Sequence, residues 1–373
     1  MNTIALSQSM DQDTARHYAG PTLTINTHKI SEQVALFKQA LPHVTPHYAV
    51  KANPLPEVLM HLHSLGVNFE IASQGELSLL KSLGIPASRI IFSNPIKTPA
   101  SILAAVEYGV EYFAFDNPEE LLKLHKLAPN AKYELRISTN GKGSVWPLTK
   151  KFGVDIDQAL ALIRFSRKHH INISALTFHV GSQCTQSQAW LTALHDCQEI
   201  IRYMNKQSMT LDMLNIGGGF PCALNESSAS FYDFMQPVNQ ALEMFKQKTN
   251  VKMCAEPGRF LVASSGTLSC QIISTTKKNR QPWAFLDCGY YNGLMELTED
   301  FGYQLQSKRT GEKIPWTIAG PTCDSVDCFT PKYELPKDSQ AGDIISIENM
   351  GAYAHTCVSN FNGFDGPSIH IKN

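Results

Sequence analysis

The sequence predicts an α/β fold: a (β/α)8 TIM-like barrel followed by a mostly antiparallel β domain. The first observation is that eight short apolar segments alternate with segments of helical periodicity between about residues 25 and 258. Such alternation favours a parallel sheet, and eight units of this kind close into a barrel of roughly 250 residues. The second is that helical periodicity nearly vanishes after Arg259. An open, doubly wound sheet is the structural alternative.

The first predicted elements are a strand over residues 22–30 and a helix over residues 31–41, with Ser31 at the capping position. The eight barrel strands are predicted at residues 47–50, 67–72, 89–93, 111–115, 132–137, 173–180, 211–216 and 251–256. Each is short and rich in aliphatic or aromatic residues, as expected for buried parallel strands.

Helix start signals lie between these strands. Ser73 and Glu76 form a predicted capping box, in which each side chain caps a backbone N–H near the helix start. Pro99 and Pro118 take the first helical position after Thr98 and an asparagine. These signals predict helices on the outside of the sheet.

The predicted domains are a barrel over residues 25–258 and a β domain over residues 259–373, to which residues 1–24 are added. Its β-rich segments are residues 260–274, 281–289, 314–323, 342–351 and 368–373. Turn residues separate them, which is typical of antiparallel sheets.

The composition indicates a small-molecule ligand. The 373 residues include 32 Lys and Arg against 33 Asp and Glu, a net charge of -1. This balance predicts neither a nucleic-acid partner nor an anionic membrane partner. No basic start precedes an apolar block, and no apolar run approaches the roughly 18 residues of a membrane span. We therefore expect a cytoplasmic protein without a membrane partner.

The nine cysteines stand singly, without a CxxC pair and in an odd number. This pattern favours reduced thiols over a disulfide framework or a zinc site. No bound metal is expected, and most of these cysteines are predicted to be small core residues.

Lys51 ends an apolar strand in the segment "HYAVKANP". At the mouth of a mostly apolar barrel lumen, desolvation would lower the pKa of its amine toward the neutral, nucleophilic form. Such an amine can form a Schiff base with a carbonyl compound. The alternative is a solvated lysine at a strand end.

Other unusual residues fall on the predicted carboxyl ends of the strands, which form the working face of such a barrel. They are Glu70, Arg136, "HVGSQ" (179–183), "GGGFP" (217–221) and "EPGR" (256–259). The glycines let backbone N–H groups approach an anion, and an arginine suits a phosphate. Together with the lysine they predict a site for pyridoxal 5'-phosphate.

In that site lysine holds the cofactor aldehyde, and Glu256 can keep the pyridine nitrogen protonated, which makes the ring a better electron sink. His179 can stack on the ring, or it can be a core histidine with satisfied hydrogen bonds. Both interpretations are compatible with its position after a buried strand.

The motifs "YAVKANP", "FEIAS", "HVGSQ", "NIGGGFP", "AEPGR", "GPTCDSVD", "GAY" and "NFNGF" resemble those of the pyridoxal-phosphate-dependent ornithine/lysine decarboxylases, which have the alanine-racemase-like barrel. The order matches over nearly the whole chain. "WPLTKKFG" and "IAGPTCDSVD" look closest to compact bacterial ornithine decarboxylases. The resemblance implies decarboxylation of L-ornithine to putrescine, and of L-lysine to cadaverine as a second reaction, in polyamine biosynthesis.

The resemblance also implies residue roles. The catalytic residues would be Lys51 as the Schiff base, His179 on the ring, Glu70, and Cys323 as the acid that reprotonates the carbanion. The cofactor would further contact Arg136, Ser182, Gly217, Gly218, Gly219, Glu256, Gly258, Arg259 and Tyr353. Family members are homodimers with shared sites, so Cys323, Asp324 and Phe361 would face the substrate from the partner. Cys323 as a buried apolar thiol is the alternative.

Two features leave the substrate open. Glu70 stands where many relatives carry Asp, which keeps the charge but changes its reach. The acid that binds the distal amine of the substrate would be Glu296, Glu299 or Asp300. The alternatives are a decarboxylase for diaminopimelate, arginine or a polyamine or siderophore precursor, an amino-acid racemase, and a non-catalytic regulatory paralogue. Cys323 favours decarboxylation over racemisation.

Overall fold

The structure is a computed structural model that describes residues 18–148, 150–222, 230–298 and 301–373. The chain forms two compact units. One comprises residues 27–264, and the other joins the described residues up to Asn26 to residues 265–373.

The first unit contains a closed barrel of eight parallel strands, which confirms the predicted fold class. In barrel order the strands are β2 (Val44–Ala49), β3 (Asn68–Ile71), β4 (Ile90–Phe92), β5 (Tyr112–Phe115), β6 (Lys132–Ile137), β8 (Ile173–Phe178), β10 (Met213–Asn215) and β11 (Lys252–Ala255). Every predicted barrel strand overlaps one of these. Chain order and barrel order agree, so each strand pairs with its successor.

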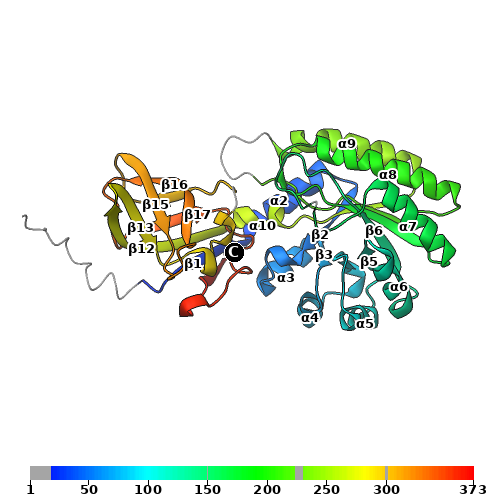
Figure 1. Ribbon diagram of the computed structural model, residues 1–373, viewed down its shortest axis with the longest axis horizontal. Coiled ribbons are helices and arrows are strands. Elements are labelled where there is room, and N and C mark those ends of the chain that lie inside the picture. Colours follow the sequence, from blue (N-terminus) through cyan, green and yellow to red (C-terminus); the bar gives the residue numbers. More distant parts are fainter. Residues whose placement is uncertain (1–17, 149, 223–229, 299–300) are drawn as a thin grey trace, which may run out of the picture. The chain divides into compact units, whose positions relative to one another are not determined.

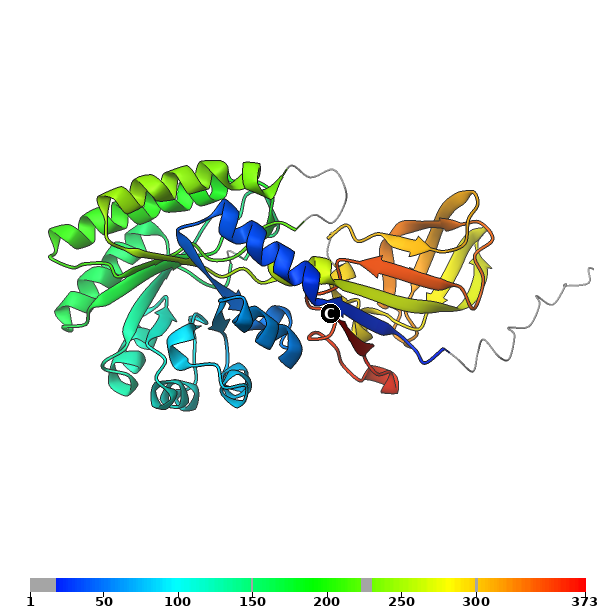
Figure 2. The ribbon, with the colours of Figure 1, turned by 180° about the vertical axis from the view of Figure 1, so that it is seen from behind.

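Helices surround the barrel strands (Figure 1). They are α2 (Thr27–Ala40), α3 (Pro56–Ser64), α4 (Gln74–Ser82), α5 (Pro99–Tyr108), α6 (Pro118–Leu127), α7 (Ile156–Lys168), α8 (Gln188–Lys206), α9 (Phe231–Lys248) and the short α10 (Arg259–Val262). Figure 2, seen from behind, shows α8 and α9 side by side on the outside of the barrel. A 3-10 turn, η1 (Val50–Ala52), follows β2.

Several predicted helix starts are present. The side chains of Thr98 and Asn117 accept hydrogen bonds from the backbone N–H groups of Ser101 and Glu120, and a proline follows each cap. Ser73 caps α4 in the same way. The carboxylate of Glu76 accepts the N–H of Ala72 at 2.5 Å, and the backbone of Ser73 also hydrogen-bonds to it, as the predicted box requires.

The predicted cap at Ser31 is wrong. The helix begins at Thr27, so Ser31 lies inside it and its Oγ contacts His61 Nε2 of α3 at 2.8 Å. The reason is the apolar stripe of α2: Ile30 is buried with Val34 and Phe37, a spacing that extends the helix one turn earlier than the polar residues suggest.

An aromatic cluster anchors the loop after β10. Phe220, directly after the three glycines, packs at 5.2 Å from the ring of Phe37 and at 5.3 Å from that of Trp190. Phe231 and Phe260 pack beside it with ring centroids 4.1 Å apart and their planes tilted by 31°. These rings connect α2, α8, α9 and α10, and so hold the glycine loop against the barrel.

The second unit is a β domain built on an eight-stranded, mostly antiparallel sheet. Its strands are β1 (Thr22–Asn26), β12 (Gly266–Lys278), β13 (Gln281–Leu286), β14 (Leu305–Ser307), β15 (Lys313–Ala319), β16 (Cys328–Pro336), β17 (Ile344–Glu348) and β18 (Ser368–Lys372). The order is β14-β17-β12-β13-β15-β16, with β1 between β12 and β18. The pairs β13–β15 and β1–β18 are parallel.

Two of these strands were not predicted. The strand β14 has three residues, and β16 contains Pro331 and ends on Pro336. A short strand gives little periodicity, and proline argues against a central strand; β16 is the edge strand of its sheet, where proline is tolerated.

A small antiparallel pair, β7 (Ser144–Trp146) with β9 (Ser182–Cys184), joins the loops that follow β6 and β8. Among the described helices, none combines the length and the apolar character needed to cross a membrane.

Candidate active site

Five titratable side chains lie where barrel strands end. Lys51 lies in the turn after β2, and His179 and Glu256 directly follow β8 and β11. Glu70 and Arg136 occupy the next-to-last positions of β3 and β6. Because the carboxyl ends of parallel barrel strands form one face, these side chains share the face on which barrel enzymes carry their sites.

The surroundings of Lys51 differ from the expected apolar lumen. Lys51 is exposed, and carboxyl groups lie near it. Burial raises the pKa values of Glu70 and Glu76, and Lys51 opposes both shifts. Acids from β3 and α4 thus add charge around the amine, and the expectation that desolvation prepares this amine stays a prediction.

Glu70 is a buried acid with only 4% of its surface exposed. Burial and the nearby carboxylate of Glu256 together raise its pKa to about 8, although Lys51 and Arg136 oppose the shift. The group therefore holds its proton at neutral pH. It can hold or give up a proton within the normal working range of an enzyme.

Two neighbours of this site, Glu134 and Asn215, were not among the predicted site residues. Both are fully buried. Asn215 Nδ2 donates to Glu134 Oε1 at 3.0 Å and to Glu256 Oε1 at 2.7 Å. Strand periodicity could have indicated both residues. Glu134 lies two positions before Arg136, and Asn215 lies two positions before Gly217, so the two members of each pair face the same side of the sheet.

His179 is held as a neutral imidazole. Its Nδ1 accepts the backbone N–H of Gly181 at 3.0 Å, so the ring proton belongs on Nε2. Burial lowers its pKa well below the usual value, with Arg136 and Lys51 acting in the same direction. The hydroxyl of Thr139 donates to the His179 carbonyl at 2.9 Å and fixes the backbone beneath the ring.

The three glycines after β10 form a cradle that no larger residue can fill. A Cβ on Gly217 would lie 1.8 Å from the carbonyl oxygen of Phe178, and its φ is +65°. A Cβ on Gly218 would lie 2.9 Å from His179 Nε2, and one on Gly219 would lie 2.2 Å from the Gly181 oxygen. The backbone therefore comes close to the ends of the neighbouring strands.

The turn after β11 lies against the lysine segment. The N–H of Ala49 donates to Pro257 O at 3.2 Å, and a Cβ on Gly258 would lie 3.2 Å from the Cβ of Ala52. Arg259 is the buried first residue of α10. Ser182 begins β9, beside the glycine loop, where the N–H of Cys184 donates to Gly219 O at 2.9 Å.

These residues fit pyridoxal phosphate. The glycine cradle and Arg259 suit a phosphate, Glu256 is held by Asn215 for a ring nitrogen, and Lys51 supplies the amine. Two observations support this fit. The backbone at residues 217–219 has room only for glycine, and a hydrogen bond from Asn215 fixes the orientation of the Glu256 carboxylate.

Other predicted residues lie in the β domain. Cys323 is exposed, not a buried apolar thiol, and its N–H donates to Asn362 Oδ1 at 2.9 Å. Asp324 accepts a hydrogen bond from the Tyr291 hydroxyl, which lowers the pKa of Asp324. The Tyr291 ring packs on Phe361 with centroids 4.7 Å apart. This group of side chains, the Cys323 cluster, also includes the exposed Val326.

Asp327 is the buried support of this cluster, and it was not predicted. Its carboxylate accepts the hydroxyl of Thr322 at 2.7 Å and the N–H of Tyr290 at 2.8 Å. A Cβ on Gly289 or Gly320 would lie 2.4 or 2.3 Å from that carboxylate. The two glycines therefore give the acid its space in the loop that carries Cys323.

Of the three acids considered for the distal amine, Glu296 is buried and accepts the hydroxyl of Tyr303 at 2.8 Å. Glu299 and Asp300 lie outside the described residues. Tyr353, the predicted phosphate contact, lies in the β domain with a left-handed backbone, φ 62°.

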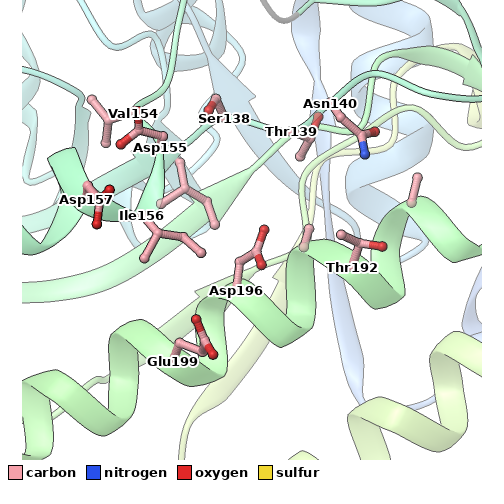
Figure 3. A pocket seen from close by; sticks show the side chains of 13 residues that line it. Ser138, Thr139, Asn140, Val154, Asp155, Ile156, Asp157, Thr192, Asp196 and Glu199 are labelled. Carbon is pink, nitrogen blue, oxygen red and sulfur yellow. The ribbon is translucent and has the colours of Figure 1, made fainter.

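Away from the barrel-end acids, a cavity of about 700 Å³ opens beside α7 and α8 (Figure 3). Its wall carries the acids Asp155, Asp157, Asp196 and Glu199. Asp155 already caps α7, because its side chain accepts the N–H of Gln158. The cavity is thus a surface hollow whose acids are partly used by the fold.

Comparison with known proteins agrees with this geometry. The family described as "Pyridoxal-dependent decarboxylase, pyridoxal binding domain" matches residues 27–263. A lysine/ornithine decarboxylase of Selenomonas ruminantium is 32% identical over 98% of this chain and 92% of its own length. An ornithine decarboxylase of Caenorhabditis elegans is 35% identical over 92% of this chain and 85% of its own length.

Among solved structures, a lysine/ornithine decarboxylase of Vibrio vulnificus complexed with cadaverine is similar with a TM-score of 0.88. It is 34% identical, and the match covers 97% of each chain. The similarity thus extends over both the barrel and the β domain.

Proposed function

Because this chain belongs to the family of pyridoxal-dependent decarboxylases, we propose that it removes the carboxyl group of L-ornithine to give putrescine, with L-lysine as a second substrate. The protein is an amino-acid decarboxylase, and its cofactor is pyridoxal phosphate. The choice of ornithine and lysine follows the named activities of its relatives, which share both units of the chain.

The observation that carries the proposal is the arrangement at one end of the barrel. Lys51, Glu256 and the glycine cradle at residues 217–219 lie on three separate strand ends of the same face. Each supplies one part of a pyridoxal phosphate site, and the cradle excludes any side chain. A solvated lysine alone would need no such surroundings.

Bound pyridoxal phosphate supplies an electron sink for the pair of electrons left when carbon dioxide departs. Glu256 would support that role at the ring nitrogen, and Asn215 Nδ2 donates to its Oε1 at 2.7 Å. His179, neutral and fixed by Gly181, offers a flat face for the ring. Gly218 has no side chain, which gives the His179 ring room.

In the cofactor-loaded protein, Lys51 would hold pyridoxal phosphate through its side-chain amine, which the amine of the substrate would replace. Glu70 lies within the electrostatic reach of Lys51 and stays protonated near neutral pH. We propose that Glu70 exchanges a proton with the amine as Lys51 leaves and returns.

We further propose that the protein works as a homodimer in which the Cys323 cluster serves the site of the partner. Its exposed residues support this assignment, since Phe361 is 42% and Val326 63% exposed. Large exposed apolar side chains next to a reactive thiol favour a surface that a partner covers. In that role Cys323 Sγ would donate the proton to the substrate carbon, and Asp324 would contact the substrate beside it.

We propose that the distal amine of the substrate pairs with Glu299 or Asp300 rather than Glu296. The hydrogen bond from Tyr303 and the burial of Glu296 support a structural role for Glu296.

We also propose a reducing, cytoplasmic location, supported by nine free cysteines.

The deciding experiment measures carbon dioxide and amine release from L-ornithine, L-lysine, L-arginine and meso-diaminopimelate by the cofactor-loaded protein. We expect ornithine to give the highest kcat/KM and lysine the next. Lys51→Ala should lose both turnover and the absorbance of covalently bound cofactor, whereas Lys168→Ala, at an exposed position of α7, should keep both. Full activity of Lys51→Ala would contradict the mechanism.

The substrate assignment has its own test. Glu299→Gln or Asp300→Asn should raise KM for ornithine by about tenfold or more, as expected for loss of a charged hydrogen bond. Glu296→Gln should change stability more than KM. If the protein turned over arginine or diaminopimelate in preference to ornithine and lysine, the assignment of ornithine as its substrate would be wrong.

A further inference from the structure

We propose that Glu134 is a positioning residue of this decarboxylase, which acts through Asn215 to fix the orientation and charge of Glu256. The inference rests on the proposed function, in which Glu256 faces the ring nitrogen of the cofactor. Glu134 itself touches neither substrate nor cofactor in this scheme, so its influence on the reaction passes through the amide of Asn215.

The orientation of the Asn215 amide follows from its hydrogen bonds. The backbone N–H of Gly217 donates to Asn215 Oδ1 at 3.0 Å, so the NH2 group must point the other way. That group has two protons, and two carboxyl oxygens accept from it: Glu256 Oε1 at 2.7 Å and Glu134 Oε1 at 3.0 Å. Asn215 therefore ties the glycine cradle, Glu256 and Glu134 together.

Glu134 contributes the far end of this chain of hydrogen bonds. It is 0% exposed, and its Oε2 lies 3.5 Å from the hydroxyl of Ser93, at the end of β4. Burying a carboxyl group in the interior of a barrel is costly unless its hydrogen bonds are satisfied. An apolar residue would fill the same space at lower cost, so a role beyond packing is the better account of an acid here.

The charges around Glu134 indicate what that role is. The titratable groups that act on it are Glu256 and Cys254 of the β11 end and Arg136 of its own strand. Burial, and next the carboxylate of Glu256, raise the pKa of Glu134 to about 8, against the opposing effects of Asn215, Arg136 and Ser93. The neutral form of Glu134 is therefore favoured near pH 7.

A neutral Glu134 leaves the negative charge with Glu256. Two ionised carboxylates sharing one amide would repel each other in a poorly solvated site. With the proton on Glu134, Asn215 keeps two acceptors, and Glu256 is the carboxyl group that would face the ring nitrogen. A protonated ring nitrogen is the state in which bound pyridoxal phosphate would best stabilise the electron pair.

The test compares Glu134→Gln with Glu134→Leu in the cofactor-loaded enzyme. Glutamine keeps a neutral acceptor for Asn215, so kcat near pH 7 should stay within a few-fold of wild type. Leucine removes the acceptor, so kcat should fall by about 10- to 100-fold with little change in KM, a range typical of partners that orient a ligating group. The absorbance of the bound cofactor should shift in the leucine variant.

The pH profile gives a second readout. As pH rises through about 8, Glu134 and Glu70 both lose protons in the wild type. In Glu134→Gln only Glu70 loses a proton in this range, so kcat should fall less steeply with rising pH than it does in the wild type. If the leucine variant does not fold, the pH profile of Glu134→Gln alone decides. The inference is overturned if kcat of Glu134→Gln falls with rising pH as steeply as kcat of the wild type.

Glu120→Gln is the matched control, because Glu120 is also a buried acid of the barrel, with 4% exposure, and pairs with Lys97 and Lys123. It should lower stability without moving the cofactor spectrum. Unchanged kcat and spectrum in a folded Glu134→Leu would overturn the inference while leaving the proposed function intact. A wild type that neither binds cofactor nor releases carbon dioxide would instead contradict the proposed function.

Discussion

The carboxylate of Asp327 accepts the backbone N–H of Tyr290 at 2.8 Å. It thereby ties the segment before the Tyr291 ring to the loop that carries Cys323. A second bond, from the Thr322 hydroxyl at 2.7 Å, closes the same loop on itself. The position of Cys323 therefore depends on a buried acid four residues further along the chain, which makes no contact with substrate in the proposed function.

We expect Asp327→Ala to lower both stability and activity. It leaves three donors without their acceptor, namely the N–H groups of Tyr290 and Thr322 and the Thr322 hydroxyl, at a cost of about 1–3 kcal/mol each where the donor stays buried. The loop should then lose its single position, and kcat should fall more than KM rises. Denaturant unfolding and steady-state kinetics check both parts. Asp338→Ala, at an exposed acid of the same unit, is the control, and an equal effect of the two variants would contradict this assignment.

The glycine cradle gives a prediction with a matched control. Gly217→Ala should abolish tight binding of pyridoxal phosphate, because its Cβ would meet the Phe178 oxygen at 1.8 Å in a backbone with φ +65°. Gly84→Ala introduces a similar backbone strain, φ +73°, but no atom lies within 4 Å of its Cβ. It should cost only about 1 kcal/mol of stability.

Titration of cofactor binding by absorbance separates the two variants. Equal affinity of Gly217→Ala and wild type for the cofactor would show that the loop does not form the phosphate site. If Gly217→Ala and Gly84→Ala both bound pyridoxal phosphate weakly, backbone strain alone would explain the loss of affinity.

The shared site of the proposed homodimer predicts complementation. Lys51→Ala and Cys323→Ala should each be inactive alone. In a mixed dimer, one site would carry both substitutions and the other neither, so an equal mixture should recover about a quarter of wild-type activity. Activity of mixtures prepared by unfolding and refolding together, or by coexpression, checks this. No recovery in a verified mixed dimer would place Lys51 and Cys323 in the same subunit's site.

The fold was largely predictable because its signals are local. Alternating apolar segments and proline or side-chain caps, such as Thr98 and Asn117, each depend on a few neighbouring residues. The start of α2 was missed because Ser31 has the right residue type for a cap, whereas the buried stripe through Ile30 determines the helix.

The candidate site was predictable only in part. Lys51, Glu70 and Arg136 stand out because charged residues at the ends of apolar strands are unusual. The bonds from Asn215 to Glu134 and from Tyr290 to Asp327 could not be predicted, because they join residues 81 and 37 positions apart and depend on closure of the barrel or of a loop. The acids around Lys51 were underestimated for the same reason.

The last prediction concerns stability in acid and a residue away from the proposed site. His47 of β2 is 7% exposed, and its ring nitrogens lie 3.3 Å from the Thr45 carbonyl and 3.2 Å from Asn68 Nδ2. Burial lowers its pKa from 6.5 to about 4. The unfolded chain therefore binds a proton at this residue between about pH 6.5 and 4 that the folded protein does not.

Stability from His47 is therefore present above about pH 6.5 and is lost as the pH falls toward 4. In this window the free energy of unfolding of wild type should fall more steeply than that of His47→Gln, by up to about 1.4 kcal/mol per pH unit. Urea unfolding at several pH values measures the difference in slope. His28→Gln, at an exposed position of α2, controls for the removal of a histidine. Parallel slopes for wild type and His47→Gln would mean that His47 is charged in the folded protein, with its ring open to solvent.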